Sequence, residues 1–448
     1  MLKLLQGLSA ILTMATTALA LAGQPSPAAL LSALRNSDHV QLEALLRRGA
    51  DANARLADGS VPLSWAVDMQ DRRAVELLLR HRAAVDDPVA AANDFRPLFV
   101  ACLHPEPMIL NMLLDAQVDV RIRGPEQLPV LAACAGRAPL AIVDRMLTAG
   151  APVDASDQRG QTALMWAAAY RRIDVFERLL AAGADPRRRT QGGFSVTMFA
   201  VKSGSARMAR RALAASGDPG QRAADGTSLL QLAMYQQNYA FAADLIALGA
   251  NFEAYDRNGR QVLHAAVLAQ QPALVAQLLT AGADVAARTA KSTVRWRYES
   301  NFRAGSYEFP AASPLELAAA QGSASIMRQL IAGGADPHAP NLDGEPLALA
   351  AAGSGDPAAL RVALDYTGDA NVHDARGQTP LHRVLDTAED HALGALLRVL
   401  AVYGAQPDIE DSRGRTAAEI AGDEHFRGRA TYAALFGPAG APAPVSNP

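Results

Sequence analysis

Acidic side chains and histidine, the groups that hold metal ions and move protons, come close together in two places in this chain. The two groups are Asp386, Glu389, Asp390 and His391, and Asp423, Glu424 and His425. A metal site is conceivable at such a spacing, but runs of charge on a helix usually face water. The sequence contains no G-x-S-x-G, H-E-x-x-H or Walker motif. We therefore expect both groups to be solvated surface, and we expect no catalytic residue, metal or cofactor.

The two cysteines are the other reactive side chains. Cys102 and Cys134 each end a six-residue apolar segment, PLFVAC (97–102) and PVLAAC (129–134). Equivalent positions of this kind should lie on neighbouring helices, whose axes are about 8–10 Å apart. A disulfide requires Cα atoms within about 7 Å. We therefore expect two buried thiols, with a disulfide as the alternative in an oxidising compartment.

These two segments belong to a repeat that runs through the chain. Twelve such segments start 32 to 37 residues apart, with one separation of 52, and their fifth residue is Ala in 11 cases. Each is followed by an apolar helical pattern, a Gly-Ala-Asp variant such as 183–185, and usually an Asp-Gly or Asn-Gly turn such as 225–226. Neither short helix is stable alone, so neighbouring units must stack into an all-α solenoid.

Two stretches carry a family resemblance. DRNGRQVLHAAV (256–267) and DARGQTPLHRVL (374–385) resemble the ankyrin-repeat pattern D-x-x-G-x-T-P-L-H-x-A. The resemblance covers about residues 28–436 and implies an ankyrin-repeat α-solenoid of about 12 helix-turn-helix units with short hairpin turns. It also implies that His264 and His382 are structural, each tying its own turn to the next.

The resemblance implies a surface for protein partners as well. Ankyrin-like solenoids bind partners on a concave face formed by turn tips and first helices. The matching positions here are Arg159, Gln161, Tyr170, Phe194, Tyr235, Gln236, Arg257, Arg260 and Arg376. Arg and Tyr often dominate interface energetics, although ordinary exposure is the alternative reading. Trp65, Trp166 and Phe199 share the fourth position of their segments, and we interpret them as packing between stacked helices.

The separation of 52 residues marks an insertion at 291–310. Its central stretch, STVRWRYESNFRAGSYEF (292–309), alternates aromatic with polar residues, which is typical of strands. We expect a two-stranded hairpin, called the finger, with its turn within 301–305. Tyr298 would then face Tyr307, and Trp296 would face Phe309.

The finger is our strongest candidate for partner binding. Its candidate residues are Arg295, Trp296, Arg297, Tyr298, Phe302, Arg303, Tyr307 and Phe309. A lone hairpin is marginally stable in water, so something must cover its aromatic face. The cover is either a partner or the finger's own repeats.

The two ends of the chain differ from the repeats. Residues 1–22 read as a cleaved signal peptide, because Lys3 precedes an apolar run that ends in small residues. An uncleaved anchor is the alternative, but polar residues interrupt the run. A linker at 23–27 follows, and the Pro-, Ala- and Gly-rich tail at 437–448 is expected to be disordered. Because 39 of 42 basic residues are Arg and the Ala content is high, we expect a bacterial protein. Its signal peptide would make it periplasmic or secreted.

A net charge of −3 gives no basic footprint for nucleic acid. We expect a monomeric, non-enzymatic protein–protein interaction module in the bacterial periplasm, with no membrane insertion after signal cleavage. It would bind a protein partner through its concave face and finger. The alternative is a periplasmic inhibitor or immunity protein that neutralises a toxin or secreted enzyme. An enzyme hidden in the repeats is a third hypothesis, disfavoured because no nucleophile–base spacing is found.

Overall fold

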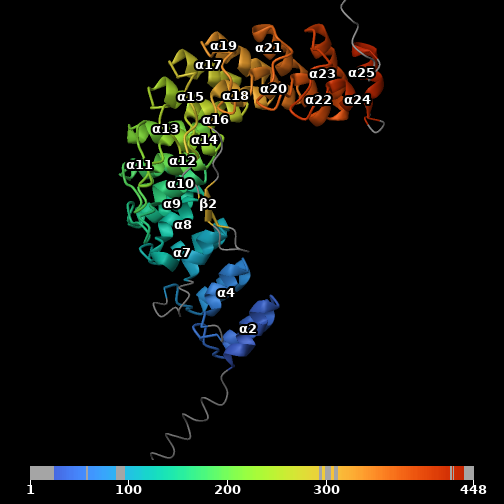
Figure 1. The fold of residues 1–448 in the computed structure, drawn as a ribbon. Helices are drawn as coiled ribbons and strands as arrows, with labels where there is room; N and C mark the ends of the chain where they lie inside the picture. Colours follow the sequence, from blue (N-terminus) through green and yellow to red (C-terminus); the bar gives the residue numbers. More distant parts are fainter. Residues whose placement is uncertain are drawn as a thin grey trace, which may run out of the picture. The chain divides into compact units, whose positions relative to one another are not determined.

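The structure is a computed structural model that describes residues 25–56, 59–86, 96–291, 295–297, 304–306, 311–423, 426 and 428–437. It divides into two compact units, Met1–Leu229 and Leu230–Pro448. In each unit short helices follow one another in pairs, and the first helix of a pair packs on the first helix of the next (Figure 1). The described residues contain 24 α-helices. The predicted signal peptide and, apart from Gly437, the predicted tail lie outside the described residues.

The first unit holds six helix pairs in its described residues. They are α2 (Pro27–Arg35) and α3 (His39–Arg47), α4 (Pro62–Asp68) and α5 (Arg72–Arg80), α6 (Pro97–Leu103) and α7 (Pro107–Asp115), α8 (Val130–Ala135) and α9 (Leu140–Thr148), α10 (Ala163–Ala169) and α11 (Ile173–Ala181), α12 (Val196–Lys202) and α13 (Ala206–Ser216). A single 3-10 turn, η1 (Pro125–Gln127), precedes α8. Here the sequence lacks the usual turn pair, and Glu126 and Gln127 take positive φ instead.

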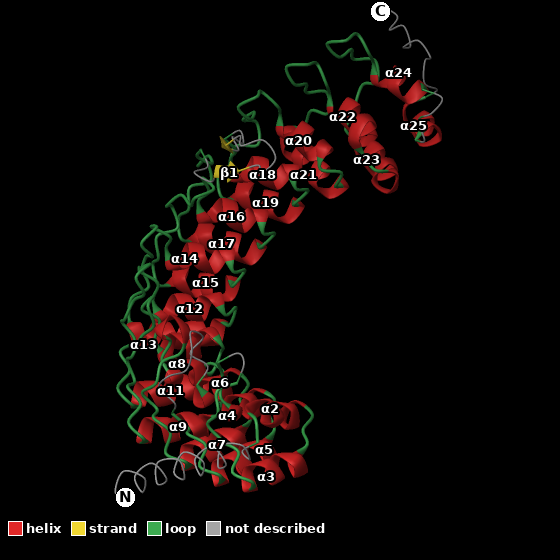
Figure 2. Ribbon diagram, turned by 90° about the horizontal axis from the view of Figure 1, so that it is seen from below, coloured by secondary structure: helices red, strands yellow, loops and turns green. Residues whose placement is uncertain are grey.

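The second unit continues the pairing and contains the insertion. Its elements are α14 (Leu229–Tyr235, which begins at the boundary) and α15 (Tyr239–Ala247), α16 (Val262–Leu268) and α17 (Pro272–Thr280), β1 (Arg295–Arg297) and β2 (Ala304–Ser306), α18 (Pro314–Ala320) and α19 (Ala324–Ala332), α20 (Leu347–Gly353) and α21 (Pro357–Thr367), α22 (Pro380–Thr387) and α23 (Asp390–Val402), α24 (Ala417–Gly422) and α25 (Arg429–Phe436). The loops before α20, α22 and α24 project on the same side of their helices (Figure 2). α23 has 13 residues, whereas α17 and α19 have nine each.

Local sequence explains the helix pairs. Pro stands at the first turn of α4, α18 and α22, where its missing N–H costs nothing. The N-cap side chains of Ser313 and Thr379 accept hydrogen bonds from the third residue of their helices. The recurrent Ala, as at Ala66 and Ala167, is fully buried, so the second helix of the pair packs closely.

Neighbouring hairpin tips are joined by backbone hydrogen bonds. The N–H of Ala224 donates to the carbonyl of Gly192 (3.0 Å), and the N–H of Ala290 donates to that of Gly259 (2.7 Å). Gly259 has a φ of 73°, and a Cβ there would overlap the carbonyl oxygen of Ala290. Glycine is the residue that adopts a positive φ at no steric cost and has no Cβ to overlap this oxygen. Arg189 strengthens the array, because its Nη1 donates to carbonyls of its own hairpin and of the next, at Gly193 and Arg222 (both 3.0 Å).

The structure contradicts the expectation of free thiols. Cys102 in α6 and Cys134 in α8 form a disulfide with a Cα–Cα distance of 4.6 Å. The error lay in comparing the spacing of helix axes with a distance between Cα atoms. Each Cα lies about 2.3 Å from its helix axis, so two Cα atoms that face each other are about 4–5 Å closer than the axes.

The expected register of the finger is also wrong. β1 and β2 are antiparallel, with Trp296 opposite Gly305 and Arg297 opposite Ala304. The partner of Trp296 is therefore Gly305 and not the expected Phe309, which lies outside the described residues. The small residues of β2 pair with β1, whereas the sequence argument used aromatic alternation alone, and alternation fixes a face but not a register. Three residue pairs are described, so the extended finger stays a prediction.

Candidate functional site

The foot of the insertion is closed by hydrogen bonds. The N–H of Thr289 donates to the carbonyl of Ala312 (2.9 Å), and the N–H of Ala312 donates to Oγ1 of Thr289 (3.0 Å). Nη1 of Arg288 donates to the carbonyl of Ala311 (2.9 Å). The chain therefore leaves the repeats and returns to them at adjacent points, as in an ordinary hairpin turn.

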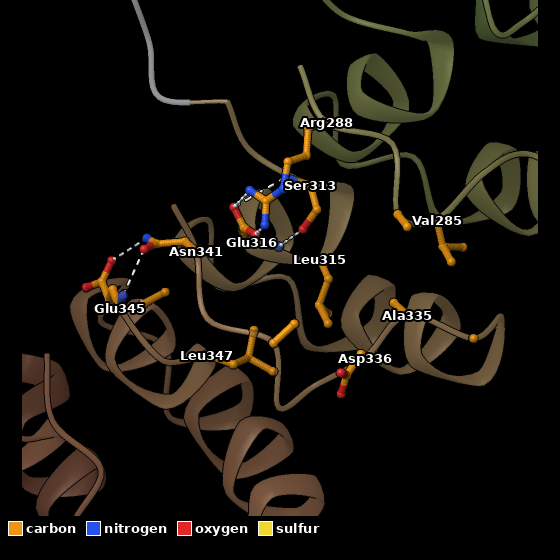
Figure 3. Close-up of a pocket in the computed structure, with 14 residues that line it drawn as sticks. Val285, Arg288, Ser313, Leu315, Glu316, Ala335, Asp336, Asn341, Glu345 and Leu347 are labelled. Carbon is orange, nitrogen blue, oxygen red and sulfur yellow. Dashed lines mark hydrogen bonds and ion pairs between the residues drawn. The ribbon is translucent and has the colours of Figure 1, made fainter. Parts of the chain in front are cut away.

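Glu316 anchors the next helix at this foot. Its Oε1 pairs with Nη2 of Arg288 (2.9 Å), and its Oε2 accepts the N–H of Ser313 (3.3 Å). Oγ of Ser313 in turn accepts the N–H of Glu316 (3.3 Å), which completes a capping box at the start of α18. Figure 3 shows this cluster at one side of a pocket.

The pocket beside Glu316 has a volume of about 270 Å³. Its apolar wall consists of Val285, Leu315, Ala335 and Leu347, and its polar wall consists of Arg288, Glu316, Asp336, Asn341 and Glu345 (Figure 3). Three carboxylates thus stand against one guanidinium. The pocket can hold a side chain with an apolar stem and a hydrogen-bond-donating head.

A second groove, of about 420 Å³, shares Glu316 and Glu345 with the pocket. It extends to Arg260, Leu317 and the strongly exposed Leu342. Glu345 is held by Nη2 of Arg383 (2.9 Å). The predicted site residue Arg260 therefore lies on the wall of a real groove.

The first unit has an exposed aromatic cluster, whereas the pocket and the groove belong to the second unit. The ring of Tyr170 stacks on Trp166 with centroids 5.9 Å apart, and the guanidinium of Arg137 lies 5.3 Å over the Tyr170 ring. Nη1 of Arg137 also donates to the carbonyl of Leu103 (3.0 Å). A Cβ at Gly136 would come within 2.9 Å of the Tyr170 ring, so this glycine makes room for it. Cation–π contact of this kind holds an exposed ring in one orientation.

The fourth-position aromatics differ from the expectation of core packing. Trp65, Trp166 and Phe199 are all partly exposed. The guanidinium of Arg35 lies 5.0 Å over the Trp65 ring. These residues therefore form part of the accessible surface of the first helices.

The other predicted residues fall on both units. In the first, Arg159 pairs with Glu126 (3.2 Å), and Phe194 is exposed at a separate hairpin tip. In the second, the guanidinium of Arg257 lies 5.0 Å over the ring of Tyr235. Burial, with help from the nearby Asp256 carboxylate, raises the pKa of Tyr235 to about 12. The structure thus groups Tyr170 with Arg137, and Tyr235 with Arg257, as two distinct surfaces.

The remaining predicted residues are less informative. Gln161 and Arg376 lie at hairpin tips, and the exposed Gln236 follows α14. Arg295, Trp296 and Arg297 lie on β1. The finger residues outside the described part of the chain are Tyr298, Phe302, Arg303, Tyr307 and Phe309.

The two histidines of the repeat have the role that the resemblance implied. Nε2 of His264 donates to the carbonyl of Ala287 (3.0 Å), and Nε2 of His382 donates to that of Arg415 (3.1 Å). Both are fully buried. Burial lowers the pKa of His264, since the charged form would lose its hydration. Each histidine therefore ties its own repeat to the next.

The acidic group near 390 includes two strongly exposed side chains, Glu389 and His391. Nδ1 of His391 lies 3.3 Å from Oε2 of Glu389, and these side chains are 79% and 81% exposed. Across the described ranges, no three His, Cys, Asp or Glu side chains gather closely enough to hold a metal ion. Within the same ranges, no helix has the length and apolar character needed to cross a bilayer.

Comparison with known proteins identifies the repeat. A family model for ankyrin repeats matches three stretches, 109–190, 197–289 and 315–411, which together exceed half of the chain. An ADP-ribosylation factor GTPase-activating protein, AGD2 of Arabidopsis thaliana, is 38% identical over 80 residues. That match covers 18% of this chain and 10% of the plant protein, so it is confined to a small part of each. The matched stretches span helices α7 to α23, and the chain belongs to the ankyrin-repeat family.

Proposed function

We propose that this chain is an exported, non-enzymatic protein–protein interaction module of the bacterial periplasm. Its ankyrin repeats make it an interaction module. We assign the helix pairs outside the matched stretches to further ankyrin units, twelve in all. The partner contacts the concave face and the finger at 292–309.

One observation carries the choice of face: the first unit exposes a preorganised stack of Arg137, Tyr170 and Trp166. Tyr170 is 41% exposed, yet its ring stacks on the Trp166 indole and contacts the Arg137 guanidinium. Fixed aromatic and arginine side chains bind partners at a low entropic cost. A tyrosine that only faced solvent would not need contacts to Trp166 and Arg137.

The disulfide supports the export. Cys102 and Cys134 are fully buried and bridged. Stable disulfides are typical of oxidising compartments such as the periplasm and are rare in the cytosol. The signal-peptide pattern at residues 1–22 points to the same compartment.

Site-specific photo-crosslinking in native periplasm tests the proposal. A photoreactive residue replaces Tyr170 in one variant and Tyr366 in a second. Tyr366 is a matched control, because it is 44% exposed but lies on a second helix, α21. We expect one specific protein adduct from position 170 and none from position 366. Equal labelling at both positions, or none at either, would refute the proposed face.

The identity of the crosslinked protein distinguishes an interaction scaffold from the alternative, an inhibitor or immunity protein. An inhibitor or immunity protein would crosslink to a toxin or secreted enzyme, and adding the purified chain would abolish that enzyme's activity. A scaffold would leave the activity of its partner unchanged. The same crosslinking sample, followed by an activity assay, decides between them.

A further inference from the structure

Three first helices of the second unit reach the following repeat through the third residue of the helix. Nε2 of Gln231 donates to the carbonyl of Ala254 (3.3 Å), as Nε2 of His264 does to Ala287 (3.0 Å) and Nε2 of His382 does to Arg415 (3.1 Å). We call this a cross-repeat bond. In each case a side-chain N–H fills the space between two repeats and satisfies a loop carbonyl.

Glu316 is the third residue of α18 and does not make this bond, and neither do Leu349 of α20 and Glu419 of α24. A carboxylate has no hydrogen to donate, so it cannot form the cross-repeat bond. It turns back to Arg288 and Ser313 in its own repeat instead. The space that a donor would fill is left as the pocket of about 270 Å³.

Loop positions place the pocket where the cross-repeat bond is made in other repeats. Ala254 and Ala287 each come 23 positions after their donor, and 23 positions after Glu316 comes Ala339. Arg415 stands two positions before the helix α24, as Glu345 does before α20. Both Ala339 and Glu345 line the pocket. The backbone positions that accept the bond elsewhere are therefore present here without a donor from Glu316.

We propose that this pocket binds the guanidinium of an arginine on the protein partner, which supplies in trans the donor that α18 lacks. This inference rests on the proposed function and adds the chemistry of one contact. Three carboxylates line the pocket, those of Glu316, Asp336 and Glu345. Arg288 pairs with Glu316 and Arg383 pairs with Glu345, which leaves one carboxylate in excess, so the pocket favours a cation. A guanidinium offers five N–H donors in a planar fork that matches carboxylates. Leu315 and Leu347 fit its aliphatic stem.

A small probe tests the pocket without the partner. Saturation-transfer NMR on the full chain uses N-acetyl-arginine amide, with the citrulline analogue as the uncharged isostere. We expect a signal from the arginine probe that is at least about threefold stronger than from citrulline, because charge-assisted hydrogen bonds are about twice as strong as neutral ones.

The decisive variant is Glu316→His. Histidine at the third helix position completes a capping box in α16 and α22, so the variant should fold. Its Nε2 should reach the Ala339 loop, fill the pocket and reduce the probe signal at least about tenfold, which corresponds to about 1.4 kcal/mol. Glu419→His is the matched control, because Glu419 has the same position and capping role in α24. It should leave the signal unchanged.

Several results would overturn the proposal: no arginine signal at millimolar probe, equal signals from arginine and citrulline, or a signal that survives Glu316→His. Circular dichroism verifies folding. Should Glu316→His not fold, Glu316→Gln keeps the size of the side chain and removes its charge, and it should still weaken the signal. Failure of the probe leaves the crosslinking at position 170 intact, so the two proposals fail separately.

Discussion

The two units build the same helix pairs but differ in two recurring contacts between neighbouring repeats. In the first unit, ion pairs connect successive second helices from α7 to α13. They are Arg145 with Asp115 (2.6 Å), Arg178 with Asp144 (2.6 Å) and Arg211 with Glu177 (2.8 Å). In the second unit, Gln231, His264 and His382 donate to loop carbonyls. One backbone plan therefore accepts either charged or neutral links between repeats.

The two units also differ in their balance of basic and acidic residues. The first unit has 26 Lys and Arg against 22 Asp and Glu, whereas the second has 16 against 23. Many arginines of the first unit are engaged within the fold, such as Arg189 with hairpin carbonyls and Arg178 with Asp144. Arginine content by itself is thus a poor guide to binding residues. Arg137 is a better candidate, because its guanidinium lies over an exposed ring.

The largest expected effect concerns the disulfide, which only the first unit has. Replacing both Cys102 and Cys134 by Ala should destabilise that unit by about 3–4 kcal/mol, because the bridge closes a loop of 32 residues in the unfolded chain. Urea unfolding followed by tryptophan fluorescence measures this. With Trp296→Phe as background, the remaining Trp65 and Trp166 report the first unit alone. An unshifted midpoint would show that the bridge does not hold the unit together.

The second effect compares two hairpin glycines within the second unit. Gly259→Ala forces a side chain into a positive φ and against the Ala290 carbonyl, whereas Gly344 has a similar φ and open space. Gly344→Ala should cost about 1 kcal/mol. Gly259→Ala should cost at least about 2 kcal/mol more, since the hydrogen bond from Ala290 is also lost. Thermal unfolding by circular dichroism ranks them, and equal costs would contradict the tip-to-tip contact.

A pH effect distinguishes the neutral links of the second unit from the ion pairs of the first. Burial lowers the pKa of His264 below its usual 6.5, so the unfolded chain binds the proton more readily. This stabilisation is complete above pH 6.5 and is lost as the pH falls below it, by at most about 1.4 kcal/mol per pH unit.

His264→Gln is the test of that effect. Gln231 already makes the same link, so glutamine should keep the bond but not titrate. Urea unfolding of both proteins at pH 7.5 and pH 5.5 measures the difference. A wild-type loss on acidification that is no larger than the variant's would mean that His264 does not contribute.

Sequence reasoning succeeded where structure is determined locally. Proline at the helix start, the recurrent Ala and the Gly turns each act within a few residues, so the helix pairs follow from the period. It failed where the outcome depends on how repeats meet. The 4.6 Å approach of Cys102 and Cys134 is a property of two packed helices. The pocket at Glu316 is recognised as lacking a donor only by comparison with the hydrogen bonds that Gln231 and His264 make in other repeats.

The smallest expected effect separates the insertion from the repeats that carry it. Replacing 291–311 by Asp-Gly makes the loop from Arg288 to Ser313 as long as that from Arg222 to Ser228. Nη1 of Arg222 donates to the Gly226 carbonyl (3.0 Å), and Arg288 could do the same with the new glycine. The shorter loop should stabilise the second unit by about 1 kcal/mol. The loop becomes roughly four times shorter, and each halving of its length lowers the entropic cost of closure by about 0.6 kcal/mol.

Urea unfolding of the shortened protein measures this change, and the crosslinking at position 170 serves as its functional control. An unchanged or raised midpoint together with a lost partner would make the insertion a binding arm. A loss of several kcal/mol would show that residues 291–311 support the repeats instead, since the Thr289–Ala312 hydrogen bonds remain available to close the turn. The repeats and the insertion would then be one structural unit.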